Sequence, residues 1–195
     1  ISTGVQSTIG YGIAVGGSTP GTSGADNDNV TIQNNNITDC AVGIYAIGTA
    51  AVSAGGDDNL NILGNSIVYN GTLANVIAIK IGQTLNSTVS TNTVNIETTA
   101  SVGIAGISLE TGSNNTLVSR NLISKVKSTN SSASSIARGI VVGTAQTGSA
   151  ITISNNVIYN VLTSWPSSTV GYGHAGIFLG SIGTSTTFTT IAGGI

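Results

Sequence analysis

Charged side chains are scarce in this 195-residue chain, which has five lysines and arginines and seven aspartates and glutamates. They make up 6% of the residues, against about a quarter in an average globular protein. The formal net charge is −2, and the few cations are scattered along the chain. Because nucleic acids and anionic membrane surfaces attract basic patches, the composition argues against both as partners.

Several other features are missing. Cys40 is the only cysteine and His174 the only histidine, so the chain cannot form an internal disulfide. A lone histidine also indicates neither a His/Cys metal site nor a Ser-His-Asp triad. No apolar run reaches the roughly 18 residues that a membrane-spanning helix needs, so we expect no membrane insertion. We expect Cys40 to be a small buried hydrophobe.

Met is absent and the chain starts at Ile1, while Lys and Cys are rare. We therefore expect a piece of a longer exported polypeptide, either secreted or displayed on the cell surface. Hydrophobic residues make up 39% of the sequence, and this content with a low net charge predicts a folded chain. We treat residues 1–195 as one segment.

Two columns of asparagine appear when the sequence is aligned on five aliphatic anchors. The anchors are Ile32, Ile62, Val89, Val118 and Ile153. Three residues after them stand Asn35, Asn65, Asn92, Asn121 and Asn156. Three residues before the first four stand Asn29, Asn59, Asn86 and Asn115. Identical amides suit stacked coils, because each Asn can donate a hydrogen bond to one neighbour and accept one from the other.

Short stretches of alternating apolar residues, such as 30–32 and 43–46, predict β-strands with one inward face. No window has helical periodicity. A repeat of roughly 30 residues built this way predicts an all-β, right-handed parallel β-helix of about six coils, with asparagine ladders and open ends. The alternative, a β-sandwich, does not explain why Asn holds one offset in five successive repeats.

The segments NVTIQNNNITDCAVGIYAIG and AITISNNVIYNV contain a strand–Asn-Asn–strand phrase. In this phrase the chain resembles the right-handed parallel β-helix repeats of the pectate-lyase-like superfamily. Its Asn/Gly/Thr-rich style is similar to large secreted or surface β-helix proteins of Bacteroidetes-type bacteria. The superfamily includes polysaccharide lyases, hydrolases and epimerases as well as adhesins and stalks, so the resemblance implies the fold rather than one activity.

Acidic residues gather in the first two anchored repeats, at Asp26, Asp28, Asp57 and Asp58. Asp28 and Asp58 share one offset, so their carboxylates are expected one coil apart. A structural calcium ion would relieve their repulsion, and it is the only cofactor that we predict. The alternative is two solvated turns whose carboxylates accept local hydrogen bonds. Glu97 is expected to form a surface ion pair with Lys125.

The connection from the second aliphatic of each repeat to the next Gly or Ala corner lengthens from 37–43 to 158–176. A shared insertion edge is often the binding edge of a repeat protein. The longest insertion and its flanks carry four candidate glycan contacts, Tyr159, Trp165, Tyr172 and His174. The alternative is that Trp165 fills the core and that His174 is an ordinary loop residue.

These patterns favour a non-catalytic structural or adhesive β-helix segment that contacts glycans or forms filaments. No catalytic residue is assigned. The alternative is a polysaccharide-active lyase or hydrolase whose catalytic cluster is incomplete in this stretch. Open ends would be covered by flanking coils of the same chain or by axially stacked copies, because exposed strand edges pair readily.

Overall fold

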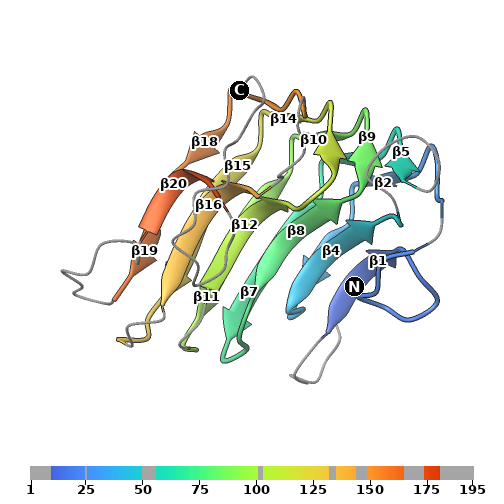
Figure 1. The fold of residues 1–195 in the computed structure, drawn as a ribbon. Helices are drawn as coiled ribbons and strands as arrows, with labels where there is room; N and C mark the ends of the chain where they lie inside the picture. The colour runs from blue at the N-terminus through green and yellow to red at the C-terminus, as the bar shows by residue number, and fades with distance from the viewer. Residues whose placement is uncertain are drawn as a thin grey trace.

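Short parallel strands make up the fold. The computed structural model describes residues 10–24, 26–49, 56–100, 103–131, 135–143, 149–164 and 174–180. Within these ranges every paired strand is parallel to its neighbours, and no helix occurs. Each strand pairs with the equivalent strand one coil later, so the chain winds as a stack of coils (Figure 1). The predicted all-β parallel β-helix, or β-solenoid, is confirmed.

Four sheets run along the stack. The first sheet holds the anchors in β2 (Thr31–Gln33), β6 (Asn61–Leu63), β10 (Thr88–Ser90), β14 (Leu117–Ser119) and β17 (Thr152–Ser154). The second contains β3 (Asn36–Thr38), β7 (Ser66–Gly71), β11 (Thr93–Thr98), β15 (Leu122–Ser128), β18 (Val157–Ile158) and β19 (Val161–Thr163), the last two both pairing with β15.

The third sheet extends furthest along the axis of the stack, and its strands lie side by side in Figure 1. Its strands are β1 (Tyr11–Val15), β4 (Val42–Ile47), β8 (Ile77–Gly82), β12 (Gly103–Leu109), β16 (Ile136–Val142) and β20 (His174–Leu179). A short fourth sheet contains β5 (Asp57–Asp58), β9 (Thr84–Leu85) and β13 (Ser113–Asn114).

The number of coils is slightly lower than expected. The five strands of the first sheet are separated by four turns, whereas the sequence predicted about six coils. The difference arises because β1 belongs to an incomplete preceding coil. The expected terminal stub at 191–195 lies outside the described residues.

The strand register matches the alignment of the sequence. The anchors pair in the order Ile32, Ile62, Val89, Val118, Ile153. The second aliphatics pair as Ile37, Ile67, Val94, Ile123, Ile158. Both rows face the interior, where their inner members are buried. The spacing of apolar residues therefore fixed the register, because a slip of one residue would turn every side chain to the other face.

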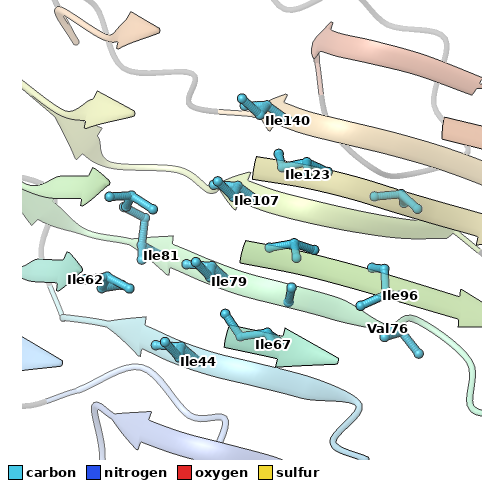
Figure 2. Close-up of a cluster of buried hydrophobic side chains, with 14 of the residues drawn as sticks. Ile44, Ile62, Ile67, Val76, Ile79, Ile81, Ile96, Ile107, Ile123 and Ile140 are labelled. Atoms are coloured by element: carbon cyan, nitrogen blue, oxygen red, sulfur yellow. The ribbon is translucent and has the colours of Figure 1, made fainter. Parts of the chain in front are cut away.

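The core consists of these aliphatic rows stacked inside the coils. Figure 2 shows Ile44, Ile79, Ile107 and Ile140 on successive strands of the third sheet, with Ile67 and Ile123 of the second sheet beside them. Cys40 is buried in the same cluster, as predicted.

The small corner residues of the third sheet are explained by close packing between coils. A Cβ atom on Gly43 would lie 2.6 Å from the Ala78 carbonyl oxygen and 2.7 Å from Cγ2 of Ile67. Both distances are too short for a real contact, so the second-sheet aliphatic of one coil occupies the space that a side chain at the corner would need. Glycine is thus selected there for its missing side chain.

Candidate functional site

The ladder from Asn35 to Asn156 is the most regular polar feature of the described chain. In each step, both the backbone N–H and the side-chain Nδ2 of one Asn donate to Oδ1 of the Asn in the next coil. The eight donor–acceptor distances lie between 2.9 and 3.0 Å. The predicted side-chain ladder is therefore present as one continuous hydrogen-bonded column.

The second amide hydrogen of the ladder residues is also used. Nδ2 of Asn92 donates to the carbonyl oxygen of Ile62, the anchor of the preceding coil, at 2.9 Å. Asn65, Asn121 and Asn156 make the equivalent bond at the same distance. Asn92 has an exposed fraction of 0%, so its amide depends on these protein partners.

The second asparagine column has a different role. Asn29, Asn59, Asn86 and Asn115 have positive φ angles between 47° and 59° and are exposed. Two side-chain bonds link its members, from Asn59 to Asn29 at 3.1 Å and from Asn115 to Asn86 at 2.6 Å. Asn is favoured here mainly because it tolerates the left-handed conformation better than most residues. Ala150, which interrupts the column in sequence, keeps that conformation with φ of 46°.

The four acidic residues of the predicted calcium site, Asp26, Asp28, Asp57 and Asp58, differ in burial and in their hydrogen bonds. Asp28 Oδ1 accepts the backbone N–H of Asp58 at 3.1 Å, as in the alternative of hydrogen-bonded turns. Asp57 and Asp58 are neighbours in β5, so their side chains leave the strand on opposite faces. Among the described residues no three acidic, His or Cys side chains are arranged to hold a metal ion. Calcium at these positions stays a prediction.

Asp57 differs from the other three acidic residues of the predicted calcium site in its burial. It is fully buried, and its Oδ1 accepts a hydrogen bond from Nδ2 of Asn27 at 3.3 Å. Its Oδ2 is buried without a hydrogen-bond partner, and so is Oγ1 of Thr84, the residue paired with Asp57 in the next coil. The pKa of Asp57 is raised to about 6, mainly by burial. The hydrogen bonds from Asn27 act to lower this pKa, and the charges of Asp26 and Asp28 act to raise it.

Glu97 forms the ion pair that the sequence predicted, together with a second one. Its carboxylate lies 3.0 Å from Nζ of Lys125 and 3.1 Å from Nζ of Lys127. Hydrogen bonding to Lys125 lowers the pKa of Glu97 below its ordinary value. These groups are partly exposed, so the cluster is a surface contact between coils.

Two of the four predicted glycan contacts can be placed. Tyr159 is exposed just after β18, and His174 is exposed at the start of β20. Tyr159 lies between β18 and β19 of the second sheet, whereas His174 is in the third sheet. Trp165 and Tyr172 lie outside the described residues. The predicted cluster therefore stays a prediction.

A pocket that sequence reasoning missed lies on the outer side of the third sheet. Its volume is about 260 Å³, and its lining includes Tyr11, Tyr45, Ile77, Lys80 and Asn75. The two tyrosine rings meet edge to face with centroids 5.5 Å apart. The only available signal was that Tyr45 and Lys80 occupy the outward position of the same repeat offset, where they are strand partners.

Comparison of the chain with known proteins does not assign it to a family. No family model matches the chain, and no curated protein or solved structure shows significant similarity to it. The described residues contain no helix that is long and apolar enough to cross a membrane. The fold thus defines the class, a parallel β-solenoid with an internal asparagine ladder.

Proposed function

We propose that this chain is a non-catalytic structural or adhesive β-solenoid segment of a secreted or cell-surface protein. The observation that supports this role most strongly is the buried ladder, in which each inner amide is fully hydrogen-bonded to the neighbouring coils. Such a column resists bending and slipping of one coil against the next, as a rigid spacer requires. The strand–Asn-Asn–strand phrase supports kinship with the pectate-lyase-like superfamily and with surface proteins of Bacteroidetes-type bacteria.

Reducing-end assays on acidic and neutral polysaccharides, with and without calcium, test this proposal. We expect no release of reducing ends in either condition. Sustained turnover that scales with protein concentration would refute the structural role and favour the lyase or hydrolase alternative.

Contact with a polysaccharide has separate support in the pocket on the third sheet. Its mixed lining of tyrosine rings, aliphatic side chains, an amide and an ammonium group suits a sugar ring, which has an apolar face and a polar edge. Titration with oligosaccharides, followed by NMR chemical shifts, should move the signals of this pocket. Lys80→Gln should weaken that response, whereas Tyr159→Ala should weaken it only if the insertion edge is the binding site.

A further inference from the structure

Residues from several elements line the pocket on the outer side of the third sheet. The neighbouring strands β4 and β8, which lie side by side in Figure 1, provide most of them. The loop between β1 and β2 contributes Gly21, and the connection between β7 and β8 contributes Ala74 and Asn75. The volume of about 260 Å³ is below the roughly 300–1,000 Å³ of pockets that take drug-sized ligands. The pocket therefore has room for a single sugar ring rather than for an oligosaccharide.

The buried part of the lining is apolar. Val42 and Ile77 are strand partners, and both are buried, as is the neighbouring Ala41. The side chains of these three residues, which we call the floor, have no hydrogen-bonding group. A hydroxyl group placed against the floor would lose its hydrogen bonds to water without replacing them, whereas a methyl group would gain by leaving water. The floor therefore favours a ligand with an apolar substituent.

The more exposed part of the lining supplies polar groups and aromatic rings. Asn75 is exposed, and its amide offers both a donor and an acceptor. The hydroxyl of Tyr45 donates to the carbonyl oxygen of Gly21 at 2.8 Å, so the oxygen of this hydroxyl can still accept a hydrogen bond. The rings of Tyr11 and Tyr45 add aromatic surface that suits the apolar face of a sugar. The pocket thus combines an apolar floor with a small number of polar groups.

The charge at the pocket is already balanced. Of the described residues that line the pocket, Lys80 alone is charged, and its Nζ lies 3.7 Å from Oε1 of Glu110. The same oxygen accepts a hydrogen bond from Oγ of Ser108 at 2.8 Å, which holds the carboxylate near the ammonium group. The carboxylate of an acidic sugar would compete with Glu110 for Lys80 and would be repelled by Glu110. A neutral sugar meets no such repulsion, and its hydroxyl groups can accept a hydrogen bond from Lys80.

We propose, on the basis of the glycan contact proposed above, that this pocket selects a sugar with an acetamido group, an N-acetylhexosamine unit of a polysaccharide. The acetamido methyl group packs on the floor. The N–H and C=O groups of the acetamido group bond to the amide of Asn75, which offers the matching acceptor and donor. A hexose lacks both the methyl group and the amide. A hexuronic acid brings a second carboxylate next to Glu110.

Titration with matched sugars tests this selectivity. The probes are methyl glycosides of N-acetylglucosamine and N-acetylgalactosamine, each compared with its parent hexose, and of glucuronic acid. NMR chemical shifts of the pocket residues give the dissociation constant of each probe. We expect one N-acetyl sugar to bind about fivefold or more tightly than its parent hexose and than glucuronic acid. Equal affinities within both pairs, or pocket signals that no probe moves, would overturn the proposal.

Asn75→Gly removes the amide and keeps the backbone. Asn75 has φ of 54°, a conformation that glycine adopts freely. We expect the affinity of this variant for the N-acetyl sugar to fall to that for the parent hexose. Asn86→Gly is the matched control, because Asn86 is also exposed, has φ of 58° and is not among the residues that line the pocket. A preference for the N-acetyl sugar that survives in Asn75→Gly, or that is lost equally in both variants, would contradict the role of the amide.

Val42→Thr tests the floor, because it replaces a methyl group by a hydroxyl group of similar size. The preference for the N-acetyl sugar over its parent hexose should fall about threefold, since the acetamido methyl loses part of its apolar contact. Val68→Thr, the same change at an exposed valine of the second sheet, should leave the preference unchanged. Thermal unfolding of both variants checks that they are folded under the conditions of the titration. An unaltered preference in folded Val42→Thr would show that the methyl group does not lie on the floor.

These outcomes are separable from the test of the structural role. Release of reducing ends from a polysaccharide would refute the non-catalytic role whichever sugar the pocket prefers. Equal binding of N-acetyl sugars and hexoses would refute the acetamido selectivity and leave the glycan contact intact. A pocket that responds to no sugar would refute both of these and leave the non-catalytic scaffold intact.

Discussion

Two columns of buried polar residues run along the solenoid, and they differ in how well their groups are bonded. The ladder at Asn65, Asn92 and Asn121 has donors and acceptors matched in every coil. The column in the fourth sheet pairs Asp57, Thr84 and Ser113, all fully buried. There, Ser113 donates to the carbonyl oxygen of Glu110 at 2.9 Å, but Asp57 Oδ2 and Thr84 Oγ1 have no partner.

The difference follows from the chemistry of the side chains. An amide has both a donor and an acceptor, so identical amides can bond in an endless stack. An ionised carboxylate only accepts, and a stack of carboxylates would also repel. One column can therefore repeat the same residue, whereas the other changes residue in every coil and leaves oxygen atoms unsatisfied. We expect the first to stabilise the solenoid and the second to be its weak point.

The largest effect should come from breaking the ladder. Asn92→Leu removes the donors to Asn121 and Ile62 and the acceptor for Asn65. Buried groups left without partners cost about 1–3 kcal/mol each, so urea unfolding should show a loss of a few kcal/mol.

Asn61→Leu is the matched control, because Asn61 lies in an outward row that already contains Leu117. We expect it to change the unfolding free energy by less than about 0.5 kcal/mol, as is usual for surface substitutions. Equal losses for the two variants would mean that the ladder contributes no more than a surface amide.

The second prediction concerns the other column. Burial raises the pKa of Asp57 to about 6 in the folded chain, from an ordinary value of 3.8 for an aspartate. The folded state therefore binds the proton more tightly, and its stability falls as the pH rises from about 4 through about 6. Asp57→Asn removes this loss, so above pH 7 the variant should be more stable by up to about 3 kcal/mol.

Thermal unfolding at pH 4 and pH 7.5 checks the sign. The gain should appear at pH 7.5 and be much smaller at pH 4, where Asp57 is already neutral. Asp39→Asn, the same change at an exposed turn, is the control. If the Asp57→Asn variant is no more stable than the native chain at pH 7.5, the prediction is wrong. The ionised carboxylate of Asp57 would then be stabilised in the folded chain, for instance by a bound cation.

The smallest effect is expected in the exposed asparagine column. Asn86 has φ of 58°, so Asn86→Val should cost about 1–2 kcal/mol through backbone strain. Asn86→Gly should be nearly neutral, because glycine adopts this conformation freely. If urea unfolding shows equal losses for both variants, the column is held by its side-chain bonds and resembles the ladder more than we infer.

Most of the architecture could be predicted from the sequence, because the same contact recurs in every coil. The anchors, the second aliphatics and the ladder at Asn35, Asn65, Asn92, Asn121 and Asn156 all found their predicted neighbours. Candidate sites were harder to predict, since they depend on single residues that do not repeat. The pocket beside Tyr45 and Lys80 joins several coils and had no periodic signal.

The sequence by itself determined the repeat, its register and the identity of the stacked residues, since in a solenoid a fixed offset in sequence is a contact in space. Only the tertiary structure decided which asparagine column is buried and which adopts positive φ at the surface, because both show the same spacing. It also decided that Asp57 points inward while Asp58 does not. The physical reason is that strand alternation and the shape of each corner set the direction of a side chain. The positions of the acidic residues in the sequence do not show which of them point inward.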